Sequence, residues 1–352
     1  MKTDIGRRKD EHLDLASTEA VAFRGRSTLL EEVTLIHESL PELSVDELDL
    51  TADVFGKRLR APLLIASMTG GTERAGAINR DLAAVAEARG YALGLGSQRA
   101  MQKDAGVAET FRVRDVAKSI LLFGNIGVVQ AREQETRALA SLVEDVGADA
   151  LFVHMNPAQE IVQAGGDRDF RGGLAALARL VRELGVPVVA KETGCGISAG
   201  LARRLADVGI TTVDVSGAGG TSWVAVETLR ASGTPRGLGE TLWDWGTPTA
   251  VSVAWCARAG LVPFATGGIK TGLDVARALA LGAHLAGIAR PVLQAWTEGG
   301  RDGVERFFDR VEAELRAVML LTGSRTPEAL RRAPKLLGPE LERWLALDAP
   351  GR

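Results

Sequence analysis

The chain contains eight short apolar runs, and their repetition constrains the fold more than any other feature. The runs are APLLIAS (61–67), YALGLGS (91–97), SILLFGN (119–125), DALFVHM (149–155), VPVVAKE (186–192), TTVDVSG (211–217), VPFATGG (262–268) and AHLAGIA (283–289). Continuous apolar runs are typical of parallel strands covered on both faces. Amphipathic stretches lie between them, such as residues 77–90, 133–147 and 273–282, and each of these ends in glycine, a common helix stop. Eight strand–helix units predict an α/β fold, a (β/α)8 TIM barrel, and not a doubly wound sheet.

The segments outside these units predict additions to one barrel. Residues 1–60 are expected to form an N-terminal extension that packs on the barrel and covers its active site. A short strand pair is possible there, around VTLIHESL (33–40) and DLTADVFG (49–56). Residues 61–325 would form the barrel and residues 326–352 a C-terminal helical tail. The connection at residues 217–246 is long and rich in Gly, Ser and Thr, which is typical of a lid or binding loop.

Composition excludes several classes of protein. Hydrophobic residues make up 46% of the chain, charged residues 25%, and the net charge is −3 with scattered Arg and Lys, so no nucleic-acid partner is expected. Cys195 and Cys256 are too far apart for a zinc or redox motif, and a chain so poor in cysteine does not require an oxidising compartment. The first residues lack the apolar region of a signal peptide, and no apolar run reaches the ~20 residues that span a bilayer. A cytoplasmic protein with no membrane segment is expected.

Residues that directly follow the strands of such a barrel meet at one mouth. Here these segments are SMTGG (67–71), GSQR (96–99), GNIG (124–127), HMNPAQE (154–160), KETG (191–194), SGAGGTSW (216–223), TGGIKTG (266–272) and ARP (289–291). The last two predict a phosphate site, because barrels often hold phosphate in the loops after strands seven and eight. The alternative is that these glycines only make tight turns.

Lys191 favours flavin mononucleotide (FMN) as the phosphate-bearing group, since a cation beside the pyrimidine end of a flavin stabilises the negative charge of reduction. Hydroxyls, an amide and one flexible apolar chain suit a flavin ring. Capping of the following helices is the alternative role for the Ser and Thr residues. The candidate cofactor-binding residues are Ser67, Met68, Thr69, Ser97, Asn125, Lys191, Ser216, Thr221, Gly267, Gly268, Ile269, Lys270, Ala289 and Arg290.

The fourth segment combines one carboxylate with neutral polar groups, namely His154, Asn156, Gln159 and Glu160. These are too few anionic ligands for a metal cage, and they include no obvious nucleophile. Basic residues suit a second anionic group such as a diphosphate, and they are Arg8, Lys9, His12 and Arg99. The alternative for RRKDE (7–11) is a solvated tail neutralised by its own acids. His37 and His284 are interpreted as structural histidines, and Cys195 as a small buried cysteine without a nearby base.

Several of these motifs together resemble one family. RKDEHL (8–13), SMTGG, GSQR, HMNPAQE, KETGCGIS (191–198), DVSGAGGTSW (214–223) and GGIKTG are similar, in order, to the type II (flavin-dependent) isopentenyl diphosphate isomerases, from about Arg8 to Leu321. The resemblance implies interconversion of isopentenyl and dimethylallyl diphosphate with reduced FMN, Mg2+ and NADPH as the reductant of FMN. It also implies a small-molecule diphosphate substrate and a homo-oligomer, tetramer or octamer.

The same resemblance implies roles for individual residues. Glu160 would bind Mg2+, and Gln159 would lie near the allylic carbon on the face away from the flavin. His154 and Asn156 would hold the diphosphate–metal end and orient Gln159, so these three are the candidate catalytic residues. The reduced flavin would move the proton, and Glu227 would be a polar neighbour. The candidate substrate-binding residues are Arg8, Lys9, His12, Ser97, Gln98, Arg99 and Gln159.

Two other functions remain open from the sequence. FMN-dependent 2-hydroxy-acid oxidases resemble the chain near VSGAGGTS (215–222), but they carry a histidine base where Ala218 stands. Oxidation of a hydroxyl group without that base lacks a proton acceptor, which disfavours an oxidase. A barrel that binds a phosphorylated metabolite without flavin is the other possibility, and a colourless purified protein would support it.

Overall fold

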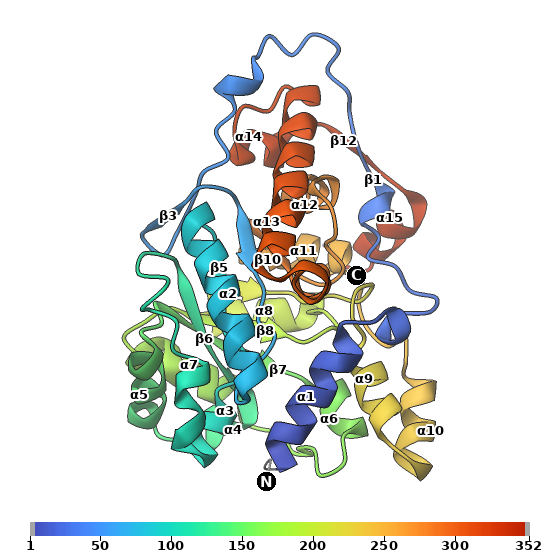
Figure 1. Ribbon diagram of the computed structural model, residues 1–352. Coiled ribbons are helices and arrows are strands. Elements are labelled where there is room, and N and C mark those ends of the chain that lie inside the picture. Colours follow the sequence, from blue (N-terminus) through green and yellow to red (C-terminus); the bar gives the residue numbers. More distant parts are fainter. Residues whose placement is uncertain (1–3, 349–352) are drawn as a thin grey trace.

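Eight parallel strands close into a barrel at the centre of the molecule (Figure 1). The computed structural model describes residues 4–348. The barrel strands, in sequence order, are β4 (Leu63–Ile65), β5 (Ala92–Gly94), β6 (Leu122–Gly127), β7 (Ala150–Met155), β8 (Val188–Glu192), β9 (Thr212–Asp214), β10 (Val262–Ala265) and β11 (Leu285–Ile288). Each strand pairs with the next along the chain, and β11 pairs with β4. The predicted (β/α)8 barrel is confirmed.

The register of four neighbouring strands aligns residues of the candidate site. Gly127 of β6 lies opposite His154 of β7, His154 lies opposite Lys191 of β8, and Lys191 lies opposite Asp214 of β9. Because these are the last residues or nearly the last residues of their strands, they share one end of the barrel. The strand order therefore brings an imidazole, an ammonium group and a carboxylate together.

Helices surround the barrel. They are α2 (Glu73–Arg89), α3 (Arg99–Lys103), α4 (Val128–Glu133), α5 (Thr136–Val146), α6 (Pro157–Val162), α7 (Gly173–Glu183), α8 (Ala199–Asp207), α9 (Trp223–Arg230), α10 (Gly233–Thr241), α11 (Thr249–Arg258), α12 (Gly272–Ala280) and α13 (Arg290–Leu321). Gly90 and Gly147 end α2 and α5 in left-handed conformations, with φ of 65° and 64°. Within residues 4–348, no helix is both long enough and apolar enough to cross a membrane.

The long connection after β9 is not a structureless loop. It contains α9 and α10, which pack on each other, and α9 also packs on α6. Ser222 caps α9 by accepting a hydrogen bond from the backbone N–H of Ala225. This connection is therefore a helical insertion at the side of the barrel mouth.

The strand pair expected within residues 33–56 is wrong, because its two members pair elsewhere. β1 (Val33–Leu35) pairs antiparallel with β12 (Lys335–Leu337), about three hundred residues later in the chain. β2 (Ala52–Val54) pairs with β3 (Lys57–Leu59) across a turn at Phe55 and Gly56, whose φ values are 48° and 77°. Such a two-residue turn with positive φ is the standard connection of a tight hairpin.

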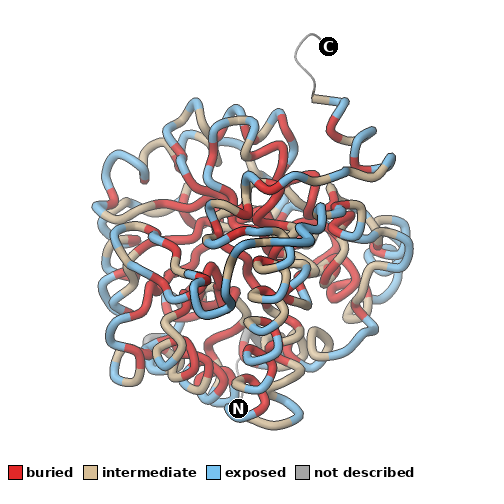
Figure 2. The backbone as a smooth tube through the Cα atoms, turned by 90° about the horizontal axis from the view of Figure 1, so that it is seen from above, coloured by how far each residue is buried: buried red, intermediate tan, exposed pale blue. Residues whose placement is uncertain are grey.

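The β2–β3 hairpin closes the end of the barrel opposite the candidate site. Its apolar residues Ala52, Val54 and Leu59 pack on a cluster inside the barrel that includes Phe123 and Phe152. These two rings stack with their centroids 4.3 Å apart. Seen from above, the buried chain runs through the interior, and the exposed chain lies around it and across the near face (Figure 2). The hairpin therefore covers the amino-terminal ends of the barrel strands.

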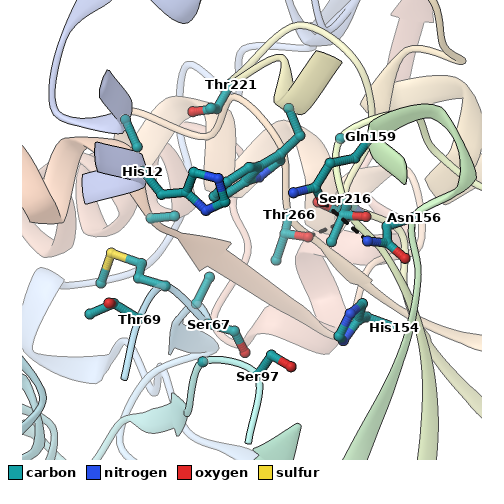
Figure 3. Close-up of a pocket in the computed structure, with 18 of the residues that line it drawn as sticks. His12, Ser67, Thr69, Ser97, His154, Asn156, Gln159, Ser216, Thr221 and Thr266 are labelled. Carbon is teal, nitrogen blue, oxygen red and sulfur yellow. Dashed lines mark hydrogen bonds between the residues drawn. The ribbon is translucent and has the colours of Figure 1, made fainter. Parts of the chain in front are cut away.

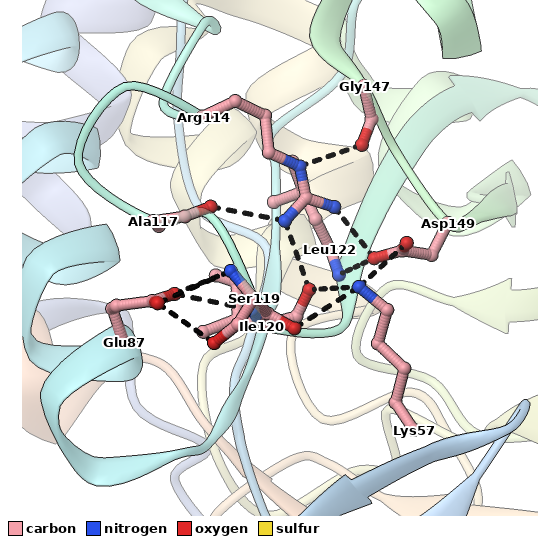
Figure 4. A network of polar contacts seen from close by, with 9 residues as sticks. All are labelled: Lys57, Glu87, Arg114, Ala117, Ser119, Ile120, Leu122, Gly147 and Asp149. Carbon is pink, nitrogen blue, oxygen red and sulfur yellow. Dashed lines mark hydrogen bonds and ion pairs between the residues drawn. The ribbon is translucent and has the colours of Figure 1, made fainter.

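A polar network fastens the hairpin to the barrel rim (Figure 4). Lys57 Nζ lies 2.8 Å from Asp149 Oδ1 and donates to the carbonyl of Ile120 at 2.9 Å. Asp149 Oδ2 also accepts from Arg114 and from the backbone N–H of Leu122, at 2.7 and 2.8 Å. Burial opposes ionisation of Asp149, but these donors outweigh it and lower the pKa of the carboxyl. The network thus stabilises the end of the barrel that the hairpin closes.

The remaining segments lie outside the barrel. α1 (Asp4–Ala16) packs on α9 at the mouth (Figure 1). The C-terminal part contains α14 (Pro327–Arg332), the strand β12 and α15 (Pro339–Ala346), which packs on α11. The end of the expected helical tail, residues 349–352, lies outside the described residues.

Candidate active site

One cavity lies at the carboxyl ends of the barrel strands, with α1 over it (Figure 3). Almost all residues predicted from the strand ends and from the N-terminal motif line it. These are Arg8, Lys9, His12, Ser67, Met68, Thr69, Ser97, Arg99, Asn125, His154, Asn156, Gln159, Glu160, Lys191, Ser216, Thr221, Gly267, Gly268, Ile269, Lys270, Ala289 and Arg290.

Gln98 is the exception, and the structure does not bring it to the cavity. Its side chain is fully buried in the opposite direction. Gln98 Nε2 donates to the carbonyl of Leu142 at 2.9 Å, and Gln98 Oε1 accepts from the backbone N–H of Asn125 at 2.9 Å. All hydrogen-bonding atoms of this amide are therefore occupied by protein groups, so it cannot contact a substrate in this arrangement.

Helix α1 covers the mouth and is bonded to it. Lys9 Nζ donates to the carbonyl of Ser97 at 3.2 Å. His12 Nε2 lies 2.9 Å from Glu227 Oε1, and Arg230 Nε donates to Glu11 Oε2 at 2.9 Å. The N-terminal motif is thus not a solvated tail. Burial, together with the neighbouring charge of Arg8, lowers the pKa of Lys9 to about 7.

The polar cluster after β7 is organised by the turn into α6. Pro157 begins this helix, with Asn156 directly before it, so that Gln159 and Glu160 fall in the first turn. Asn156 Nδ2 donates to Glu160 Oε1 at 2.9 Å and to Gln159 Oε1 at 3.2 Å. Gln159 Nε2 in turn donates to Glu227 Oε1 at 3.3 Å. The orientation of the Gln159 amide is thereby fixed from both sides.

Glu160 is a buried carboxylate with 7% of its surface exposed. Its Oε2 accepts from the backbone N–H of Asp167 at 2.7 Å and from Gln163 Nε2 at 3.2 Å. Among residues 4–348, no group of three or more His, Cys, Asp or Glu side chains could hold a metal ion without other ligands. Glu160 could therefore supply only one protein ligand, and a metal there would need further oxygens from a substrate and from water, as Mg2+ commonly does.

Lys191 is paired with Asp214 inside the barrel wall. Lys191 Nζ lies 3.0 Å from Asp214 Oδ2, and Asp214 Oδ1 accepts a short hydrogen bond from the hydroxyl of Thr266. Burial, with the charges of Lys191 and Arg99, lowers the pKa of the nearby His154 to about 4. The imidazole of His154 is therefore neutral at physiological pH, and the ammonium group of Lys191 has a fixed counter-ion.

The glycine loops after β9 and β10 leave room for an anion. Gly267 and Gly268 have φ of 98° and 77°, and a Cβ on Gly268 would lie 2.3 Å from Thr28 Cγ2. A Cβ on Gly220 would lie 2.3 Å from the backbone nitrogen of Gly268. Within the described part of the chain, the N–H groups of Gly267, Gly268 and Ile269 have no hydrogen-bond acceptor. Glycine is therefore required here, and the exposed amides form a concave set of donors.

Several residues that line the cavity carry a buried side-chain atom without a hydrogen-bond partner in residues 4–348. They include the Nη1 of Arg290 and the hydroxyl of Ser67, besides Arg8 Nε and, apart from its ion pair with Glu227, His12 Nε2 on α1. Buried donors of this kind are normally satisfied, so they indicate a ligand. Helix capping does not explain the predicted hydroxyls, because Thr72, Ser198, Ser222 and Thr271 cap the adjacent helices. The donors fit the phosphate and ring of FMN.

Sequence reasoning missed several lining residues. Thr266, Trp223 and Gln163 stand in or beside quoted motifs, and their position after a strand could have identified them. Gln130, inside α4, carried no signal of this kind. Cys195 is partly buried, and burial raises the pKa of its thiol, so it is no nucleophile.

Comparison with known proteins agrees with this geometry. Residues 154–336 match the model of the FMN-dependent dehydrogenase family. The chain is 44% identical to an isopentenyl-diphosphate delta-isomerase of Methanosarcina acetivorans, over 95% of this chain and 92% of the relative. It is 45% identical to the enzyme of the same name from a Synechococcus species, over 96% and 98%.

Among solved structures, a mandelate oxidase with (S)-2-phenylpropionate superposes with a TM-score of 0.61, covering 96% of this chain and 99% of that one, at 19% identity. This likeness shows the shared barrel fold and nothing finer. The identity to the curated relatives extends over nearly the whole chain, and the FMN-dependent family model matches its second half. The chain therefore belongs to the type II, FMN-dependent family of isopentenyl-diphosphate delta-isomerases.

Proposed function

We propose that this protein interconverts isopentenyl diphosphate and dimethylallyl diphosphate, with FMN and Mg2+ bound and NADPH as the reductant of FMN. The observation that supports the proposal is that two sets of hydrogen-bond donors and cations line one cavity. The first consists of the glycine-loop amides with Arg290. The second lies under α1, where Arg8, Lys9 and Arg99 line the cavity together with Glu160.

The first subsite fits the phosphate of FMN. Its free N–H groups and the unpaired Nη1 of Arg290 are donors of the kind that phosphate requires. FMN bound there in its reduced form would supply the group that donates and removes the proton of the reaction. Lys191 would lie beside the ring, where its charge, fixed by Asp214, stabilises negative charge.

The second subsite fits a diphosphate and one metal ion. Arg8, Lys9 and Arg99 supply positive charge, and the single buried carboxylate of Glu160 would hold Mg2+ against the phosphate oxygens. His12 would act from α1, where Glu227 holds its ring in place. Closing α1 over the mouth would exclude water from the reacting carbons.

Gln159 would face the allylic carbons as a neutral group. Its amide is held by Asn156 on one side and by Glu227 on the other. A carboxylate at this position could form a bond to an electron-poor carbon, but an amide is a far weaker nucleophile. The arrangement therefore protects a cation-like species while the proton is transferred.

We also propose that the protein works in the cytoplasm as a homo-oligomer, a tetramer or an octamer. Large apolar side chains that are mostly exposed support association, for example Leu40, Leu336 and Trp245 at 70%, 63% and 63%. Light scattering on the purified protein would give the oligomeric state. A monomer would contradict this part of the proposal.

Oxidation of a 2-hydroxy acid is disfavoured by Ala218. This residue is fully buried, and its methyl group offers no proton acceptor. Its backbone N–H donates to the carbonyl of Thr247, which fixes the loop without a basic side chain. The mouth thus lacks a base at the position where such oxidases have their histidine.

An anaerobic assay tests the proposal. The protein is incubated with FMN, Mg2+, NADPH and labelled isopentenyl diphosphate, and dimethylallyl diphosphate is measured together with NADPH oxidation. Because substrate and product have the same oxidation level, far less than one NADPH should be consumed per product over many turnovers. Stoichiometric consumption would instead indicate a dehydrogenase, and a protein without yellow absorbance would indicate a flavin-free barrel.

A further inference from the structure

The side-chain amide of Asn125 determines which nitrogen of His154 carries hydrogen. Asn125 Nδ2 donates to the carbonyl of Leu95 at 3.0 Å, so the NH2 end of the amide faces Leu95. The other end, Oδ1, lies 2.8 Å from His154 Nδ1. An amide oxygen can only accept, so the hydrogen of this bond must be on His154 Nδ1.

His154 Nε2 is consequently left without hydrogen. The ring is neutral, because it is buried and because the cations Lys191 of β8 and Arg99 of α3 disfavour a further positive charge. In the described chain, Nε2 has no hydrogen-bond partner, although His154 lines the cavity. The nitrogen that remains available to a ligand is therefore a hydrogen-bond acceptor.

Gln98 fixes the backbone of Asn125. Gln98 Oε1 accepts from the N–H of Asn125 at 2.9 Å, and the N–H of Gln98 donates to the carbonyl of Asn125 at 2.8 Å. The opposite end of the Gln98 amide donates to the carbonyl of Leu142 at 2.9 Å. Gly124 makes room for this arrangement, since a Cβ there would lie 2.8 Å from Gln98 Oε1.

We propose that Gln98 and Asn125 are positioning residues that hold His154 with its hydrogen on Nδ1 and present Nε2 to the ligand as an acceptor. The ligand group at Nε2 must then be a hydrogen-bond donor, and in the diphosphate subsite the candidates are water on a bound cation and a protonated oxygen of the diphosphate. The identity of this ligand rests on the proposed function. The tautomer itself does not.

His154 thus has a different role from the cationic residues of the same subsite. Arg99 and Lys9 can donate to any phosphate oxygen, whereas a neutral Nε2 repels an ionised one. His154 would thus select the orientation in which a hydrogen-bearing oxygen meets it. It would contribute to the geometry of the bound metal–diphosphate group and not to the neutralisation of its charge.

Nitrogen NMR of the FMN-loaded enzyme labelled with 15N-histidine tests the proposal. The sequence has only four histidines, His12, His37, His154 and His284, so assignment by single Gln variants is practical. His284 provides an internal contrast, because its Nε2 lies 2.9 Å from the carbonyl oxygen of Asp53 and must carry the hydrogen. We expect the hydrogen on Nδ1 in His154 and on Nε2 in His284. The reverse tautomer or an imidazolium at His154 would overturn the proposal.

Two variants test the positioning roles. Gln98→Met removes both amide bonds at nearly equal size, and we expect His154 to become a mixture of tautomers. Gln102→Met, at an exposed glutamine of α3, should leave the spectrum unchanged. Asn125→Asp places a carboxylate at Nδ1, which should convert His154 to an imidazolium. If Gln98→Met does not fold, Asn125→Asp alone tests the positioning roles. An unchanged His154 spectrum in the folded variants would overturn them.

Inorganic pyrophosphate, added with and without Mg2+, identifies the donor. In either case Nε2 should remain free of its own hydrogen but shift as it accepts a hydrogen bond. A shift that requires Mg2+ assigns metal-bound water, and a shift with pyrophosphate alone assigns a protonated oxygen. Full protonation of Nε2 in the complex would overturn the acceptor role. Because none of these spectra measures turnover, a failure of the isomerase assay would leave them interpretable.

Discussion

Lys191 Nζ lies 3.0 Å from Asp214 Oδ2, and the two side chains are only 6% and 1% exposed. They are register partners on adjacent strands of the barrel, directly beneath the cavity. Removing charges from water is costly, so a buried pair of this kind is more sensitive to loss of one partner than to loss of both. The pair therefore allows a test of stability that is independent of catalysis.

Asp214→Asn should destabilise the FMN-free protein by about 3–5 kcal/mol, because it leaves the ammonium group of Lys191 buried without a counter-ion. The Asn side chain keeps an acceptor for Thr266, so the loss is confined to charge. The double variant Lys191→Met with Asp214→Asn should recover much of the loss. Urea unfolding followed by tryptophan fluorescence measures both. Equal or greater destabilisation in the double variant would contradict the pair.

Gly268→Ala should prevent FMN binding. The substitution adds a Cβ that would lie 2.3 Å from Thr28 Cγ2, at a residue whose φ is 77°. The loop would have to move, and its free amides would lose their alignment. Gly185→Ala is a matched control, with φ of 81° and open space around its Cβ. Flavin absorbance after gel filtration should fall only in the first variant; comparable flavin content in both would exclude the loop as the phosphate site.

Glu160→Gln should raise the Mg2+ concentration needed for activity and lower kcat/KM about 100-fold or more, since a metal-bridged contact is worth several kcal/mol. The NH2 group of the new amide would also face a donor where the carboxylate now accepts a hydrogen bond. Those donors are Asn156, Gln163 and the N–H of Asp167. FMN affinity should change little, because the glycine loops lie on other strands. Wild-type activity at limiting Mg2+ would show that Glu160 is not a ligand.

Lys9 should make substrate binding depend on pH. Its pKa of about 7 in the free enzyme means that it is charged below pH 7 and increasingly neutral above. KM for the diphosphate should therefore rise as pH increases through 7. Once the diphosphate is bound, its negative charge should favour the protonated form of Lys9. Between pH 7 and the ordinary pKa of 10.5, the unfolded chain binds more protons, so this group makes folding stability rise with pH in that window.

Lys9→Arg should flatten that rise in KM, because arginine stays charged at all of these pH values. Lys118→Arg is the matched control, because Lys118 is exposed and does not line the cavity. This variant should keep the wild-type profile. Steady-state kinetics from pH 6 to 9 make the comparison. A pH profile of KM that is identical in all three proteins would remove Lys9 from the binding site.

Deleting residues 1–12 should raise KM at least about tenfold, because charge-assisted hydrogen bonds are worth roughly 1.5–3 kcal/mol each. It removes the contacts of Lys9 with Ser97, of His12 with Glu227 and of Glu11 with Arg230. Loss of the cover should also lower kcat by admitting water. FMN affinity, measured by fluorescence titration of the apoprotein, should stay nearly the same. Unaltered kinetics would mean that α1 is no lid.

The barrel could be predicted from the sequence because its strands are buried on both faces and read as continuous apolar runs. The mouth followed from topology, since residues after parallel strands share one end. The β1–β12 pairing could not be predicted, because three-residue strands three hundred residues apart leave no periodic signal. The turn at Phe55 and Gly56 could not be predicted, because a phenylalanine with positive φ is uncommon in such a turn.

Gln98 shows the limit of reasoning from motif position. It stands between Ser97 and Arg99, which both line the cavity, yet its side chain points into the wall. Direction depends on the backbone of a short loop, where φ and ψ are set by neighbours such as Gly124 and not by a regular period. Conversely, Arg8, Lys9 and His12 share one face of α1 through spacing of about one helical turn, which the motif did contain.

The separation of α1 and α9 along the chain has a consequence for biosynthesis. Glu11 binds Arg230, which follows it by 219 residues. At about 5–20 residues per second on the ribosome, roughly 10 to 40 seconds separate their synthesis. Helix α1 can therefore make this contact only after residue 230 has been synthesised, when the strands from β4 to β9 already exist. Until then, the ends of these strands cannot be held under α1 by its bond to α9.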